Sequence, residues 1–281
     1  MKFGVFMFVT DYSIGPAELA RAAEERGFEW LLFPEHTHIP TSRRTPWPGG
    51  GELPEEYRHT LDPFVAAAVA AAVTKELKVG TGVCLVPQHH PISLAKRVAT
   101  LDLVSGGRFI FGVGAGWNEE EMEHHGVHPR HRWQVLRESI LAMKAIWTQE
   151  EAEFQGRFVR FERIWSWPKP VQKPHPPIWV GGHGRQVLRR VVEWGDGWMP
   201  IISREERLGE RIRELQSLAQ EAGRGPIPVT AFGVSARPQV LEELARLGVE
   251  RCIFWLRPGS AQEVLPYLDT CAELARQFAQ A

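Results

Sequence analysis

Short apolar runs alternate along the chain with longer stretches in which apolar residues recur every three or four positions. The short runs predict β-strands buried on both faces, as parallel strands covered by helices are. The strands are expected at residues 2–9, 30–34, 78–86, 109–113, 178–181, 197–201, 229–234 and 251–256.

The longer stretches between them predict helices. Pro16 places proline in a first helical turn, and Gly27 ends that helix. The longest helix carries a core-facing apolar stripe made of Trp133, Leu136, Ile140, Met143 and Trp147. The remaining helices are expected at residues 61–75, 93–104, 184–194, 204–222, 238–248 and 261–279.

Eight strands alternating with eight helical segments predict an α/β fold, a (β/α)₈ TIM barrel, as a single domain over residues 1–281. A doubly wound sheet is the alternative, but no glycine-rich fingerprint follows the first strand. Insertions interrupt the rhythm after strand two (39–59) and before strand five (151–177, with a hairpin at 154–158). We expect both insertions to close over the active site.

The composition narrows the class of protein. The 281 residues carry 33 Lys and Arg against 34 Asp and Glu, so the basic excess of a nucleic-acid binder is missing. The longest apolar run, 64–73, is about half a membrane span, and no signal peptide is seen. Cys84, Cys252 and Cys271 fit buried thiols in a reducing cytoplasm. We expect a cytoplasmic protein with a small-molecule substrate and no nucleic-acid or membrane partner.

Candidate chemistry follows the second strand, since the active sites of TIM barrels lie at the carboxyl ends of their strands. Glu35 and His36 stand there. Histidine is the side chain best suited to proton transfer near neutral pH, so His36 is a candidate catalytic residue. Glu35 is a second candidate, which either orients His36 or faces solvent. A capping role for the histidine is the alternative.

Glycines, which have no side chain, recur in and after the neighbouring strands three and four. They are Gly80, Gly82, Gly112, Gly114 and Gly116. A flat ring would fit against such bare backbone, although a barrel corner or close packing would also need it. The turn Gly181-Gly182-His183 leads into a helix and offers backbone N–H groups to an anion, unless it is a plain turn. Together these features favour a planar, phosphorylated cofactor.

A metal site is the competing hypothesis. His36 and His38 form a His-x-His pair that His183 would complete, but the other ligands of such a site are missing from strands one and eight, and we expect no metal. A second histidine cluster is expected to be a solvated surface face beside residues 119–123. It consists of His124, His125, His128 and His131.

Five stretches resemble the luciferase-like monooxygenase superfamily, in particular its branch of coenzyme F420-dependent oxidoreductases. They are Phe33-Pro34-Glu35-His36, Gly80-Thr81-Gly82-Val83, and the segments 112–117, 168–182 and 195–200. They occur in the family's order over residues 1–200, whereas the last 80 residues match only in rhythm.

The resemblance implies a TIM barrel with F420, or alternatively FMN, at the strand ends. It implies a non-prolyl cis peptide at Gly82-Val83 behind the ring, a proton-transfer role for His36, and a phosphate held near Gly181 and Gly182. Relatives also suggest a homodimer. The full predicted cofactor site is Gly82, Val83, Gly114, Ala115, Gly116, Gly181, Gly182 and His183.

One position departs from part of this family. Trp117 stands where the sugar-phosphate dehydrogenases carry a carboxylate, so we expect hydride transfer between F420 and a small apolar substrate. An FMN-dependent monooxygenase and a non-catalytic cofactor-binding protein are the alternatives. The side chains expected to wall the cleft are Trp47, Trp165, Trp167, Trp198 and Trp255, and those expected to meet the carboxylate tail of F420 are Arg43, Arg44 and Arg58.

Overall fold

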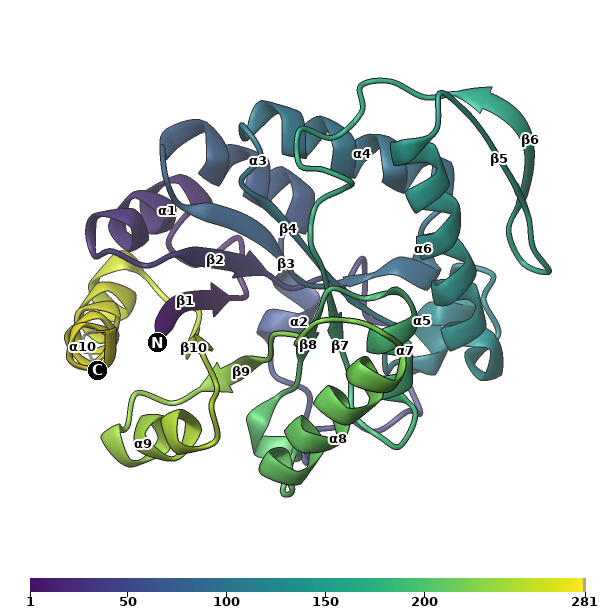
Figure 1. The fold of residues 1–281 in the computed structure, drawn as a ribbon. Coiled ribbons are helices and arrows are strands. Elements are labelled where there is room, and N and C mark those ends of the chain that lie inside the picture. Colours follow the sequence, from purple (N-terminus) through teal and green to yellow (C-terminus); the bar gives the residue numbers. More distant parts are fainter. Residues whose placement is uncertain (280–281) are drawn as a thin grey trace.

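The computed structural model describes residues 1–279, and its parallel strands close into a barrel (Figure 1). The sheet order is β8-β7-β4-β3-β2-β1-β10-β9, and parallel bridges from Trp198 to Val229 and from Ile201 to Phe232 join the ends. The strands are β1 (Lys2–Met7), β2 (Trp30–Phe33), β3 (Lys78–Leu85), β4 (Phe109–Gly114), β7 (Ile178–Gly181), β8 (Gly197–Met199), β9 (Thr230–Val234) and β10 (Arg251–Leu256). The predicted TIM barrel is confirmed.

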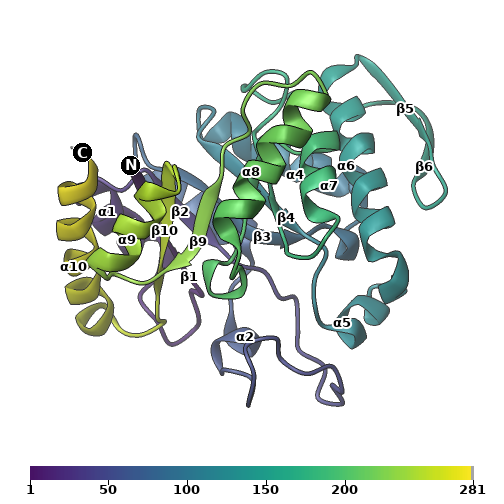
Figure 2. The same ribbon diagram turned by 60° about the horizontal axis from the view of Figure 1, so that its bottom comes forward.

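Helices surround the barrel and cover the outer faces of its strands (Figure 1). The main ones are α1 (Pro16–Glu25), α3 (Pro63–Val73), α4 (Pro91–Val104), α6 (Arg132–Thr148), α7 (Val187–Trp194), α8 (Leu208–Glu221), α9 (Pro238–Arg246) and α10 (Ala261–Ala279). Proline begins several of them, because its missing N–H is not needed in a first turn. Two short helices, α2 (Glu56–His59) and α5 (Glu119–His124), lie at the same end of the barrel (Figure 2).

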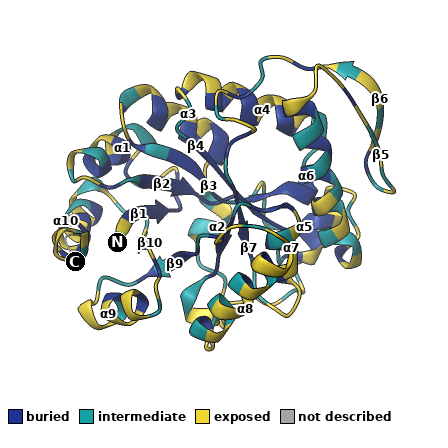
Figure 3. Cartoon of the chain, in the orientation of Figure 1, coloured by how far each residue is buried: buried dark blue, intermediate teal, exposed yellow. Residues whose placement is uncertain are grey.

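The barrel interior is filled by side chains. The buried side chains that fill it are Phe6, Phe8, Trp30, Leu32, Ile110, Trp179, Met199, Phe232 and Ile253. The Phe6 and Phe232 rings lie 4.3 Å apart, and a larger apolar layer packs between strands and helices (Figure 3). A ligand must therefore bind at the mouth of the barrel rather than inside it.

The insertion 151–177 does not close over the mouth. Its hairpin, β5 (Glu151–Gln155) and β6 (Arg160–Trp165), lies outside α6, away from the barrel axis (Figure 1). The Glu138 carboxylate on α6 fixes it there by accepting backbone N–H groups of Arg157, Phe158 and Val159 at 2.7–3.1 Å. The predicted hairpin is present, but its predicted role as a lid is wrong.

The insertion 39–59 lies at the carboxyl ends of the strands, where it was predicted to lie, and contains α2 (Figure 2). The three cysteines are buried free thiols, as predicted. Within residues 1–279, no helix has both the length and the apolar character that crossing a bilayer requires.

Candidate active site

His36 lies at the mouth of the barrel, three residues beyond the end of β2. Its Nδ1 is 2.8 Å from Oε2 of Glu121, and its Nε2 lies 3.3 Å from the indole N–H of Trp117. A carboxylate only accepts and an indole only donates, so this network places the proton on Nδ1 and a lone pair on Nε2. The geometry therefore prepares Nε2 to accept a proton, as a general base does.

Glu121 lies on α5, which begins two residues after Trp117, and from there its carboxylate reaches His36. The Asn118 side chain accepts the backbone N–H of Glu121 and caps the helix, whose first turn is acidic as its dipole favours. The Glu120 and Glu121 side chains are 8% and 0% exposed. The histidine cluster that follows is largely exposed, as expected, with His124, His125 and His128 on the surface, whereas these two glutamates point inward. A run of three glutamates does not reveal which of them points inward.

Glu35 neither orients His36 nor faces solvent, so both sequence-based expectations are wrong. Its buried carboxylate binds Nε2 of His89 at 2.9 Å and accepts the Leu85 backbone N–H at 2.6 Å. Burial opposes its ionisation, but the hydrogen bonds and charge of His89 lower the pKa of Glu35. The carboxylate thus fixes the end of β3, and a catalytic part for Glu35 stays a prediction.

Two glycines at the strand ends leave room for the side chain of Val83 rather than for a ligand alone. The cis peptide at Gly82–Val83 is present, as the resemblance implies. A Cβ at Gly114 would lie 2.7 Å from Cγ2 of Val83, and one at Gly181 would lie 3.0 Å from Cγ1. Val83 therefore covers these two positions, so the absence of side chains there does not by itself indicate a ligand.

Gly116 is less crowded, because an added Cβ there would make only ordinary van der Waals contacts, at 3.8–3.9 Å with Met122 and Gln88. Gln88, in the 3₁₀ turn Val86–Gln88 after β3, is buried, and neither end of its amide has a partner within residues 1–279. Nδ2 of Asn118 is also unpartnered in this range. Buried polar atoms without partners cost free energy, so these groups fit a ligand with a polar edge, such as the pyrimidine ring of F420 or FMN.

The turn after β7 brings together part of the predicted phosphate end. Gly182 has a φ of +135°, and Nδ1 of His183 lies 3.2 Å from Glu205 Oε2. Nε2 of His183 is buried without a partner among the described residues, and burial lowers the pKa of this imidazole. The Trp198 indole donates to the Gly182 carbonyl from behind the turn at 3.2 Å. Trp198 is fully buried, so the prediction that it walls the cleft is wrong.

An aromatic cover from the insertion 39–59 lies over His36. The Tyr57 ring is 5.2 Å from the His36 ring, 4.6 Å from Phe8 and 5.9 Å from Trp47. Burial raises the pKa of Tyr57, so its hydroxyl stays protonated. Trp47 therefore belongs to the wall of the site, whereas Trp165 is 74% exposed on the outer hairpin.

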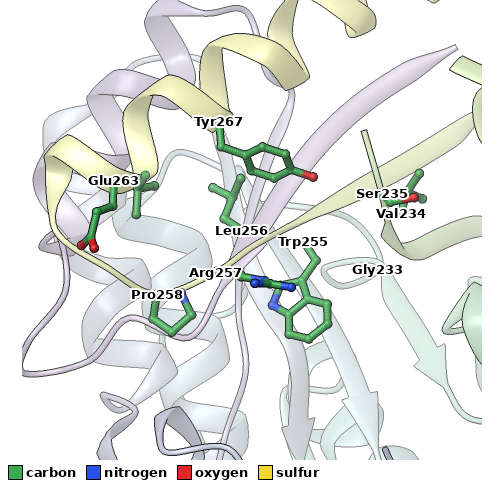
Figure 4. A pocket seen from close by; sticks show the side chains of 10 residues that line it. Gly233, Val234, Ser235, Trp255, Leu256, Arg257, Pro258, Glu263 and Tyr267 are labelled. Carbon is green, nitrogen blue, oxygen red and sulfur yellow. The ribbon is translucent and has the colours of Figure 1, made fainter. Parts of the chain in front are cut away.

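Trp167 is likewise remote, at 58% exposed beyond the hairpin, so the prediction that these two tryptophans wall the cleft is wrong. Trp255 does lie at the mouth. It lines a cavity of about 620 Å³ at the ends of β9 and β10, together with Ser235, Arg257 and Tyr267 (Figure 4). This hollow offers an apolar ring beside polar groups near the strand ends.

The aromatic cover is tied to α5 through Glu120. Burial opposes ionisation, but hydrogen bonds from the Thr45 hydroxyl and from the Arg44 and Thr45 backbone lower the pKa of Glu120 to about 2. Arg44 also faces Glu120 at 3.5 Å, and Arg58 pairs with Glu55 at 2.9 Å. Arg43 lies over the Trp117 ring at 5.7 Å. These arginines are engaged locally, which removes the support for the prediction that they meet a carboxylate tail.

Among the described residues, the metal site considered as the competing hypothesis, with His36, His38 and His183 as ligands, is not assembled. Within residues 1–279, one group of three potential ligands lies close enough to share an ion, namely Glu35, Cys84 and His89. It contains neither His36 nor His38. His38 instead bonds to His124 at 2.8 Å on the surface.

With this geometry established, comparison with known proteins identifies the family. A family model described as Luciferase-like monooxygenase matches residues 1–257. The chain belongs to the luciferase-like monooxygenase family. Members are oxidoreductases or monooxygenases, and relatives that match this chain use either F420 or FMN.

Particular family members resemble the chain over different lengths. An uncharacterized protein of Mycobacterium tuberculosis is 42% identical over 97% of this chain and 98% of its own. An F420-dependent hydroxymycolic acid dehydrogenase of the same species is 28% identical over 74% of this chain and 54% of its own. Monooxygenase RslO1 from Streptomyces bottropensis, 21% identical, superposes with a TM-score of 0.82 over 99% of this chain and 100% of that one.

Proposed function

We propose that this luciferase-like protein is an oxidoreductase that transfers a hydride between F420 and a small, apolar organic substrate. The observation that carries the proposal is His36, a buried imidazole whose Nδ1 faces the Glu121 carboxylate at 2.8 Å. Hydride transfer between a carbonyl and an alcohol needs a group that moves the hydroxyl proton, and His36 has the required lone pair on Nε2.

F420 supplies the hydride chemistry when it is bound. In alcohol oxidation, Nε2 of His36 takes the hydroxyl proton, and Glu121 stabilises the imidazolium that forms. The bond from Trp117 to Nε2 is 3.3 Å, longer than a typical N–H donor bond, so a substrate hydroxyl can replace it. In the reverse direction the same nitrogen returns the proton.

Other side chains hold and cover the reactants. Gln88 and Asn118 offer their unpartnered amides to the polar edge of the ring, and Tyr57 with Trp47 excludes water above His36. The aromatic cover and the apolar ring of Trp255 suit an apolar substrate better than a phosphorylated sugar. Trp117 supports the same choice, because an indole cannot replace a catalytic carboxylate.

F420 is preferred to FMN on two grounds. The matching F420-dependent dehydrogenase of Mycobacterium tuberculosis supports it. The His36–Glu121 pair also supports it, since moving a substrate proton is central to alcohol oxidation. An FMN-dependent monooxygenase is the alternative, because flavin-dependent monooxygenases are also among the relatives.

A binding titration tests the cofactor, and a variant tests catalysis. Apo-protein is titrated with F420 and with FMN by fluorescence quenching, and we expect tighter binding of F420. His36→Ala should lower turnover of secondary alcohols by about 10²–10⁴-fold while F420 binding persists. His90→Ala changes an exposed histidine that makes no side-chain cap and serves as the control. Unchanged turnover in His36→Ala would favour a non-catalytic binding protein, and preference for FMN would overturn the cofactor.

A further inference from the structure

A groove lined by arginines runs between α7 and α8, which lie side by side in Figures 1 and 2. It has a volume of about 720 Å³. Its lining residues are Arg185, Gln186, Arg189, Arg207, Glu210, Arg211 and Glu214. No step of the proposed reaction uses these side chains.

The groove has unpaired positive charge. Glu210 pairs with Arg207, and Glu214 lies 3.7 Å from Nε of Arg211. Arg185 and Arg189 are exposed and form no ion pair with residues 1–279. Four guanidinium groups against two carboxylates leave two net positive charges, which favour an anionic ligand.

The groove is continuous with the predicted phosphate end of the cofactor site. Nη2 of Arg211 donates to the Gly184 carbonyl at 2.8 Å, and its guanidinium lies 5.7 Å from the Trp198 ring. Gly184 directly follows His183, whose Nε2 is buried without a partner among the described residues. Arg185 lies in the turn between Gly184 and α7, and Arg189 lies on α7, so both line the groove where it begins beside this turn.

We infer that this groove binds the oligocarboxylate tail of F420, with Arg185 and Arg189 as its principal contacts. The inference rests on the proposed function, because FMN ends at its phosphate and has no carboxylate to place there. It assigns to α7 and α8 the task that the sequence suggested for Arg43, Arg44 and Arg58. Exposed arginines suit a flexible polyanion, since charge attraction requires no single geometry.

The test compares F420 molecules with different tail lengths. Dissociation constants are measured by fluorescence quenching for F420 with one and with five or more glutamates, for the tail-less deazaflavin precursor FO, and for FMN. At low salt, wild type should bind the long-tailed form most tightly. In 0.5 M salt this difference in affinity should disappear, because exposed charges are screened over roughly 4 Å, the Debye length at that salt concentration.

Arg185→Gln combined with Arg189→Gln should weaken long-tailed F420 by about tenfold and leave FO and FMN unchanged. The matched control combines Arg21→Gln with Arg276→Gln, two exposed arginines on α1 and α10. The control should bind every ligand as wild type does. Circular dichroism and thermal melting check that both double variants stay folded.

The inference can fail in two distinguishable ways, one that leaves the proposed function standing and one that does not. If wild type binds all F420 forms with the same constant, or if the control weakens long-tailed F420 equally, the groove does not hold the tail and the proposed function stands. If wild type binds FMN but no F420 form, the proposed cofactor and this inference fail together.

Discussion

Replacing Glu121 by glutamine tests the central pair of the site with little change of shape. The glutamine can keep its Oε1 near the Thr37 backbone N–H, where the carboxylate now accepts at 3.3 Å. Its amide NH₂ then faces Nδ1 of His36 at the place of Oε2. An NH₂ group donates, so it favours the tautomer with the proton on Nε2, where a base needs a lone pair. The variant thus removes the negative charge and reverses the direction of the hydrogen bond.

The size of the effect follows from the burial of the pair. Side-chain exposures of 5% for His36 and 0% for Glu121 leave no water to replace the lost charge. A hydrogen bond to a charged group contributes about 1.5–3 kcal/mol. If this is lost as the imidazolium forms, kcat falls by about tenfold to 150-fold. The dissociation constant of F420 should change less than threefold, because the Glu121 side chain contacts the base and only the Glu121 backbone, which the substitution keeps, contacts Asn118.

Steady-state turnover of a secondary alcohol with F420 gives kcat and KM, and fluorescence quenching gives the cofactor affinity. Glu120→Gln is the matched control, because this neighbouring carboxylate is also buried but binds Thr45 rather than His36. It should raise KM more than it lowers kcat, since it loosens the cover. A Glu121→Gln enzyme with wild-type kcat, or with cofactor affinity lost in proportion to kcat, would refute the role of Glu121.

Three further predictions concern stability and binding. The lowered pKa of Glu120 stabilises the folded protein at pH values above the ordinary glutamate pKa of 4.5, and this stabilisation is lost as the pH falls toward about 2. The difference in unfolding free energy between wild type and Glu120→Gln should therefore shrink over that pH range, as urea titrations can measure. Gln88→Leu should weaken F420 binding by about tenfold yet leave the protein as stable or more stable, because the unpartnered amide is removed; parallel melting and quenching experiments decide this. Gly114→Ala should cost about 1–3 kcal/mol by crowding Val83, and Val83→Ala should recover part of that loss in denaturant unfolding.

The barrel could be predicted from the sequence because its signals are local and repeated. Each strand is a short apolar run, and most helices have an apolar stripe and often a starting proline. The location of the hairpin 151–165 could not be predicted in this way. It depends on contacts between distant parts of the chain. The Glu138 carboxylate accepts three backbone N–H groups from a segment some 20 residues later, and Ala152 packs in the core. Nothing in the local pattern of the hairpin indicates that anchor.

The sequence indicates a candidate site residue only where the residue type itself suggests a chemical role. His36 at a strand end was informative, because few side chains serve proton transfer there. Glu121 and Gln88 were missed, because their roles depend on which face of a one- or two-turn helix is buried. A helical turn of only three to six residues is too short for periodicity to reveal that face. The position of α5, directly after the glycine-rich end of β4, was the available signal.

Two adjacent glutamates on α5 connect the cover of the site to its base. Glu120 holds Thr45 of the insertion, and Glu121 holds His36, 85 residues away along the chain. The insertion 39–59 and the candidate base therefore contact two consecutive residues of the same short helix. Because, within residues 1–279, the Glu120 carboxylate hydrogen-bonds only to the cover and the Glu121 carboxylate only to the base and its neighbour Thr37, substitution of one glutamate at a time separates the contribution of the cover from that of the base.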